Sequence, residues 1–73
     1  MNKRLTAVIQ SEGDGFVALC PELDITSQGS TIQEARDQLH EALELFFECA
    51  SQAEIEGRLG ADVFVTQVEV SIS

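Results

Sequence analysis

The feature that most constrains this chain is a single amphipathic segment that begins at Thr31. Its apolar residues recur every three or four positions, which is the period of an α-helix with one buried face. Thr31 and Glu34 also fit the S/T-x-x-E capping box that starts many helices. We therefore predict one helix from Thr31 or Ile32 to about Gln52, packed on a sheet through positions 32, 35, 39, 42, 43, 46, 47 and 50.

Short β-prone runs precede this helix. Residues 5–10 and 16–20 flank a glycine-rich turn that includes Gly15, so they predict a β-hairpin. Pro21 lacks an N–H donor and is expected to end the second strand. A third short strand is expected over Asp24 to Gln28, with Gly29 allowing a tight turn before the helix.

After the helix, Gly57 and Gly60 indicate a loop, and residues 63–72 predict a last strand. A chain of 73 residues is too short to divide into two cores, so residues 1–73 form one domain. The element order predicts the α+β class: a β-β-β-α-β domain of two layers, with one long helix packed on a mostly antiparallel sheet.

The predicted strands are apolar on both faces, whereas a sheet with one face in water alternates apolar and polar residues. Val17 and Leu19 lie on one face, and Phe16 and Ala18 lie on the other. Because one helix covers only one face, we expect the second face to be covered by self-association, as a dimer or higher oligomer, or by a protein partner.

The chain is strongly acidic. Thirteen carboxylates and four basic side chains give a net charge of −9. Phosphate backbones attract cations, so direct binding to nucleic acid is not expected. The charge fits either plain solubility or attraction to a basic protein. No apolar run is long enough to span a bilayer and no export signal is evident, so a cytoplasmic protein without a membrane role is expected.

Cys20 and Cys49 are 29 positions apart and match no metal-binding or redox motif. We interpret both as reduced, small apolar side chains in a reducing compartment.

Candidates for catalysis are few. His40 is the only histidine and lies four residues before Glu44, which indicates a surface pair rather than a general base. The stretch from Glu12 to Gly15 contains too few oxygen ligands for a calcium loop and is interpreted as a turn. The first strand contains no carboxylate that could anchor a metal-dependent nuclease site. We predict no enzyme activity, no metal and no cofactor.

The helix has a second face, nearly opposite the apolar one, where carboxylates gather. Leu45 lies at the edge of this face and forms a small apolar strip with Ala42 and Cys49. A solvated face is the simplest interpretation, and a contact site for a partner is the alternative. The candidate contact residues are Glu34, Asp37, Glu41, Glu44, Leu45 and Glu48.

The pattern in residues 15–44 resembles the N-terminal domain of the HicB antitoxin family. The resemblance lies in the run GFVALCPELDITSQGST from Gly15 to Thr31, then in Glu34-Ala35, Leu39 and Glu41-Ala42. The matching motif residues span less than half of the chain, whereas the predicted order of strands and helix agrees over nearly the whole chain. Gly15, Pro21, Gly29, Thr31 and Glu34 are explained as scaffold residues, without a ligand. Asp24-Ile25-Thr26 replaces the Pro-Gly-Cys-like stretch common in the family and is closer to a shorter subgroup.

The resemblance implies a truncated RNase H-like fold in which the last strand lies beside the first. It also implies a partner: HicB proteins bind and mask HicA, a small basic mRNA-cleaving toxin. Full-length HicB proteins add a DNA-binding segment, and we expect this chain to be a short member without it. The alternative is a stand-alone homo-oligomeric domain of unassigned function, without a toxin partner. An RNA-processing enzyme is disfavoured because the first strand lacks carboxylates.

Overall fold

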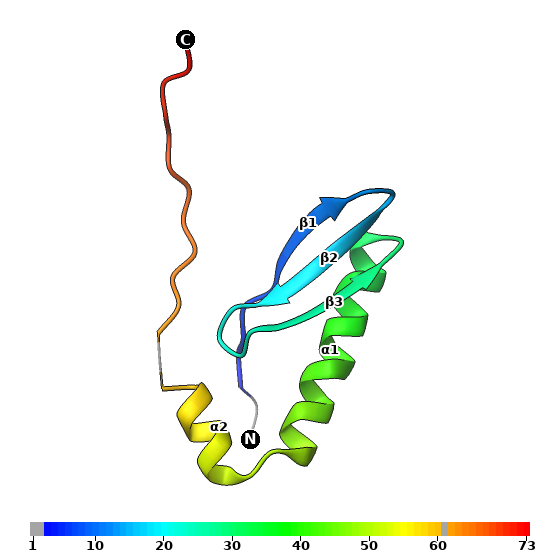
Figure 1. Ribbon diagram of the computed structural model, residues 1–73, viewed down its shortest axis with the longest axis vertical. Helices are drawn as coiled ribbons and strands as arrows, with labels where there is room; N and C mark the ends of the chain where they lie inside the picture. Colours follow the sequence, from blue (N-terminus) through cyan, green and yellow to red (C-terminus); the bar gives the residue numbers. More distant parts are fainter. Residues whose placement is uncertain (1–2, 61) are drawn as a thin grey trace.

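The computed structural model describes residues 3–60 and 62–73, in which a three-stranded sheet is followed by two helices (Figure 1). The strands are antiparallel and lie in the order β1-β2-β3, so β2 is central. The predicted α+β class, with one long helix packed on an antiparallel sheet, is confirmed. The elements are β1 (Val8–Glu12), β2 (Gly15–Cys20), β3 (Ile25–Gly29), α1 (Ile32–Cys49) and α2 (Gln52–Arg58).

The predicted β1–β2 hairpin is confirmed, with a two-residue turn between the paired residues Glu12 and Gly15. Gly13 has φ +58°, a left-handed conformation that glycine adopts without steric cost. The next turn begins at Pro21, immediately after β2 ends, as the sequence predicted. Its last residue, Asp24, is also left-handed, with φ +54°, a conformation that aspartate tolerates better than most residues.

The core lies between α1 and one face of the sheet. Its fully buried side chains come from β2, the β2–β3 turn and the first two turns of α1, namely Ala18, Cys20, Leu23, Ala35 and Leu39. Leu43, Phe46 and Phe47 pack against this cluster and are only partly buried. Ile32 was expected in the core but is 56% exposed, because the helix begins beyond the edge of the packed surface.

Gly29 is where β3 and α1 approach most closely. A Cβ atom on Gly29 would lie 2.6 Å from the backbone nitrogen of Ala35. A Cβ atom on Gly15 would similarly lie 2.7 Å from the carbonyl oxygen of Gly29. Gly29 does not have a positive φ. Glycine is therefore required at position 29 because of this close packing, and not because of the turn conformation that the sequence suggested.

The Thr31 cap predicted at the start of α1 is confirmed, and the return bond from Glu34 is displaced by one residue from the capping-box pattern. Thr31 Oγ1 accepts a hydrogen bond from the Glu34 backbone nitrogen at 3.0 Å. Glu34 Oε1 accepts one from the backbone nitrogen of Ser30, also at 3.0 Å. The Glu34 nitrogen is a donor that the helix itself leaves free, whereas Ser30 lies one residue before the cap.

The helical region ends differently from the prediction. α1 stops at Cys49, and α2 occupies the region expected to be a loop, with Gly57 inside it. Ser51 explains the break, because its Oγ accepts a hydrogen bond from the Glu54 nitrogen at 3.1 Å and caps a new helix. Arg58 fastens α2 to the core: its guanidinium donates to the Leu23 carbonyl and lies 5.5 Å from the centroid of the Phe46 ring.

The predicted last strand is not part of the sheet. Residues 62–73, here called the C-terminal segment, form no strand and extend along the molecule's 49 Å long axis, apart from β1 (Figure 1). The expectation that this strand lies beside the first is therefore wrong for a single chain. Every residue of the segment except Val63 is exposed.

The sheet face opposite α1 is mixed in character. Val8, Val17 and Leu19 lie together there, in register across β1 and β2, and are half-buried. Exposed Gln10 and Gln28 flank them. This face is less apolar than the sequence pattern indicated, so the prediction that it needs a cover loses its main support. The larger exposed apolar surface is the C-terminal segment.

Candidate interaction surfaces

The six predicted contact residues all lie exposed along α1. We call this set the acidic face. It consists of Glu34, Asp37, Glu41, Glu44, Leu45 and Glu48. The helix period aligns these residues because they recur at spacings of three or four. The structure thus brings the predicted residues together on one side of α1, and two of them, Glu44 and Glu48, also line the groove described below.

The first two members of the acidic face are held by local bonds. Glu34 accepts the hydrogen bond from the Ser30 nitrogen described above. Asp37 accepts a hydrogen bond from Gln33 Nε2 at 2.9 Å, and its Oδ1 lies 3.8 Å from Arg36 Nη1. Both side chains of that ion pair are about three-fifths exposed, so the pair contributes little to stability.

The centre of the acidic face is formed by Glu41, Leu45 and Glu48. Among the described residues, neither of these two glutamates forms an ion pair or a side-chain hydrogen bond. Leu45 is 59% exposed, which confirms that it points away from the core. Cys49 is exposed beside it and Ala42 is half-buried. A partner could contact this centre without first breaking an internal bond.

The predicted pair of His40 and Glu44 is confirmed. His40 Nδ1 lies 3.5 Å from Glu44 Oε1, and both side chains are about two-thirds exposed. No other side chain is recorded as a partner of this histidine in the described part of the chain. The arrangement is a surface contact and lacks the second group that orients a general base.

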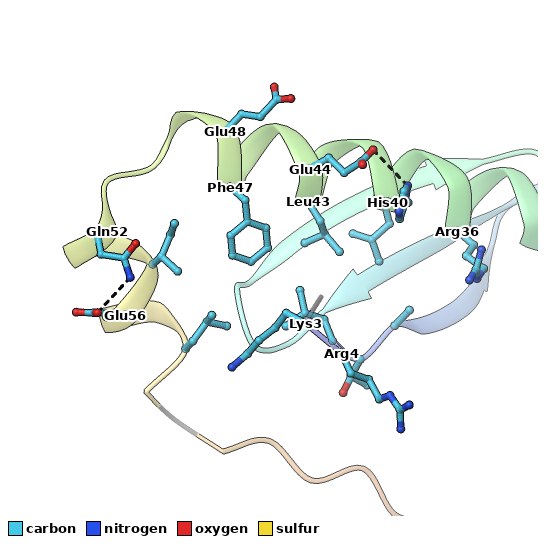
Figure 2. Close-up of a pocket in the computed structure, with 16 residues that line it drawn as sticks. Lys3, Arg4, Arg36, His40, Leu43, Glu44, Phe47, Glu48, Gln52 and Glu56 are labelled. Atoms are coloured by element: carbon cyan, nitrogen blue, oxygen red, sulfur yellow. Dashed lines mark hydrogen bonds and ion pairs between the residues drawn. The ribbon is translucent and has the colours of Figure 1, made fainter. Parts of the chain in front are cut away.

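A groove of about 1280 Å³ separates the chain before β1 from the two helices (Figure 2). Lys3 and Arg4 lie on one side of it, and Leu43 and Phe47 of α1 point into it from the other. Ile55 and Leu59 of α2 also contribute apolar surface. Sequence reasoning missed this groove, because it depends on α2, which was predicted to be a loop. The pattern Ser51-x-x-Glu54 is the signal that could have predicted that helix.

Basic side chains concentrate at this groove. Lys3, Arg4 and Arg36 line it, which leaves Arg58 as the only basic residue elsewhere in the sequence. His40, Glu44 and Glu48 lie along its α1 side. The surface outside the groove therefore carries carboxylates with almost no compensating cations.

Glu22 holds the chain that leads into β1. Thr6 donates to its carboxylate through the backbone nitrogen, at 3.0 Å to Oε2, and through Oγ1, at 2.7 Å. Partial desolvation of the Glu22 carboxylate raises its pKa, but hydrogen bonds from Thr6, from its own backbone N–H and from the Cys20 thiol together outweigh this effect, and the net pKa is lowered. The ionised form of Glu22 is thus the form that fits the fold.

The two cysteines are unbonded and have different surroundings. Cys20 lies in the core, where burial raises the pKa of its thiol, so the neutral form is favoured. Cys49 is exposed at the end of α1. Cys20 thus packs as a core side chain, and Cys49 lies on the surface with exposed Leu45, where the predicted apolar strip placed it.

Residues 3–60 and 62–73 contain no group of three or more His, Cys, Asp or Glu side chains that could hold a metal ion. The Glu12–Gly15 stretch forms the tight hairpin turn described above, as predicted. Within the same residues, no helix has the length and apolar character that crossing a bilayer requires.

Comparisons with protein-family models, with curated proteins and with solved structures gave no match to this chain. The resemblance to the HicB family therefore remains a prediction carried by the motifs in residues 15–44.

Proposed function

We propose that this chain is a non-catalytic protein-interaction module whose acidic face binds a small basic protein. The observation that carries the proposal is the exposed row of carboxylates on α1, with Leu45 among them. The resemblance to HicB antitoxins supplies the class of partner, a HicA-like mRNA-cleaving toxin that would be masked by direct binding. This chain would therefore act as an inhibitor of that toxin and not as an enzyme.

Charge supports this class of partner. A protein that cleaves mRNA presents cations to the phosphate backbone, and a surface of opposite sign steers and orients it. The net charge is −9, and three of the four basic side chains line the groove rather than the centre of the acidic face. Occupying the toxin's cationic surface would compete directly with RNA.

The centre of contact is expected at Glu41, Leu45 and Glu48. Glu34 and Asp37 are engaged in bonds within α1, and Glu44 is paired with His40. Leu45 offers an apolar side chain that is already exposed and can be buried by a partner without cost to the core. The flanking glutamates then supply charge-assisted bonds at the rim.

The test is binding of the purified chain to a HicA-like toxin encoded beside it, measured by calorimetry and by protection of RNA from cleavage. The double variant Glu41→Lys with Glu48→Lys should weaken binding by about tenfold or more, because each change replaces attraction with repulsion. The matched control is Glu12→Lys with Glu54→Lys, which makes the same change in net charge outside the acidic face. It should change affinity by less than about threefold.

Added salt should slow association of the unmodified chain, because screening weakens electrostatic steering. Equal loss of affinity in both double variants would assign the effect to net charge alone and contradict a defined acidic contact site. Absence of both complex and RNA protection would contradict the proposal as a whole.

The second candidate is a stand-alone homo-oligomeric domain without a toxin partner. The specific observation that favours it is the exposed apolar C-terminal segment, whose Phe64 is 87% exposed and Ile72 91%. In that case the acidic face would serve solubility only.

A further inference from the structure

The C-terminal segment has the residue pattern of a half-buried strand but no partner strand. Val68, Val70 and Ile72 alternate with polar residues over positions 67–73, Phe64 falls on the same side, and Val63 and Val65 fall on the other. Such alternation is typical of a strand with one face packed and one in water. Yet the first four of these side chains are 70–91% exposed. An apolar face of this kind is expected to be covered in the working form of the protein.

The same chain has an open sheet edge of matching length. The ten residues from Lys3 to Glu12 comprise β1 and the chain before it, and no strand of the described residues lies on their outer side. The Thr6 nitrogen points inward to Glu22. Successive N–H groups of an extended chain alternate in direction, so those of Leu5 and Ala7 point to the open edge. Residues 63–72 are also ten in number.

The groove beside this edge supplies an apolar surface for the added strand. A strand placed next to residues 3–7 would lie over the exposed flank of α1, where Leu43 and Phe47 point into the groove (Figure 2). The edge at β3 offers no equivalent, because the start of α1 packs against its last residue, Gly29. The β1 edge is therefore the one built to accept a strand.

We propose that the C-terminal segment of one chain pairs with residues 3–12 of a second copy, and that the exchange is reciprocal. The side chains of Phe64, Val68, Val70 and Ile72 then face the partner's α1 across its groove. Each sheet gains a fourth strand beside β1, and both open edges are closed in one two-fold symmetric dimer. This proposal does not depend on binding of a toxin.

Two observations favour a second copy as the source of the strand. The segment starts beside its own Lys3 and Leu5 but then extends away from its own sheet (Figure 1). A strand held away from its own edge is placed to reach another molecule. The second observation is that each chain carries one such segment and one such edge. Two copies therefore satisfy both without any other protein.

Charge sets the salt dependence of this association. Two chains of net charge −9 repel each other, while the apolar contact is insensitive to screening. Self-association should therefore become tighter as salt is added. Binding of a basic toxin should become weaker under the same change, so the two interactions are distinguishable in one titration.

The experiment compares Val68→Lys with Gln67→Lys in the full chain by sedimentation equilibrium. Both variants add one positive charge at neighbouring positions, but only Val68 lies on the apolar side of the segment. The Val68→Lys variant should raise the dimer dissociation constant by at least about tenfold, and Gln67→Lys by less than about threefold. Far-UV circular dichroism shows whether both variants keep the fold.

An isotope-filtered NOE experiment on a mixture of labelled and unlabelled chains identifies the origin of the strand. Contacts between residues 64–72 of one chain and residues 3–12 of the other are expected. Equal dimerisation of both variants would overturn the proposal. So would a dimer in which these contacts arise only within one chain, or a monomer at high micromolar concentration.

Discussion

At the scale of single residues, Glu22 shows how one side chain fixes a segment without a strand partner. Residues 3–7 continue beyond the end of β2, and the bonds from Thr6 to the Glu22 carboxylate hold them in line with β1. Cys20 Sγ lies 3.5 Å from the same carboxylate and donates to it. These bonds hold residues 3–7 against the turn between β2 and β3.

Replacing Glu22 by Gln should lower the free energy of unfolding at pH 7 by about 1–2 kcal/mol, because hydrogen bonds to a charged acceptor are lost. The folded-state pKa of Glu22 lies below its unfolded value. The stability that it contributes is therefore present above the unfolded pKa and is lost as the pH falls through the folded pKa. The difference between the two proteins should shrink from pH 5 to pH 3 when measured by urea unfolding.

Glu41→Gln is the control, since Glu41 is exposed on α1, lies outside the proposed dimer contact and should leave stability unchanged at both pH values. A stability difference for Glu22→Gln that is as large at pH 3 as at pH 7 would contradict the role given to the ionised carboxylate.

At the scale of elements, the close contact of β3 with α1 determines which glycine can be replaced by alanine without loss of stability. Gly29→Ala should lower the free energy of unfolding by about 1–3 kcal/mol, because the added methyl group overlaps backbone atoms that cannot move independently. Gly57→Ala should raise it by about 0.5–1 kcal/mol, since Gly57 lies inside α2 with no atom near its Cβ position. Chemical denaturation of both variants tests the pair, and a change of the same sign in both would refute this assignment.

The elements also show what local sequence can predict. The hairpin, the end of β2 at Pro21 and the Thr31 cap depend on neighbours within about four residues, and all were predicted correctly. The end of α1 was not, because helical periodicity ran past Ala50 and the Ser51 cap was overlooked. The exposure of the acidic face followed directly from helical spacing.

The pairing of the last strand and the shape of the groove depend on contacts between distant parts of the chain, which periodicity does not report. The sequence pattern identified residues 63–72 as strand-like but could not specify which edge, or which molecule, receives them. The apolar character of the sheet face opposite α1 was overestimated for the same reason. Gln10 and Gln28 become neighbours of Val17 only through the strand register.

At the scale of the whole molecule, the described chain is a two-layer domain whose C-terminal segment lies outside the sheet. Its extents of 49 × 27 × 18 Å show how far the C-terminal segment departs from the packed part (Figure 1). Few residues are fully buried, which is typical of a small domain that gains stability by association. The acidic face and the open edge lie on different elements, but Glu44 and Glu48 also line the groove, so a dimer formed through the edge leaves Glu34, Asp37, Glu41 and Leu45 of both copies free.

Amide hydrogen exchange of the full chain over a range of concentrations tests the central claim, that this sheet is completed by another molecule. The account predicts that protection of residues 3–7 and 64–72 rises together as concentration increases, while protection of α1 residues in the core is present throughout. Full protection of both segments at the lowest concentration, where the chain is monomeric, would show that the sheet closes on itself and would contradict the account.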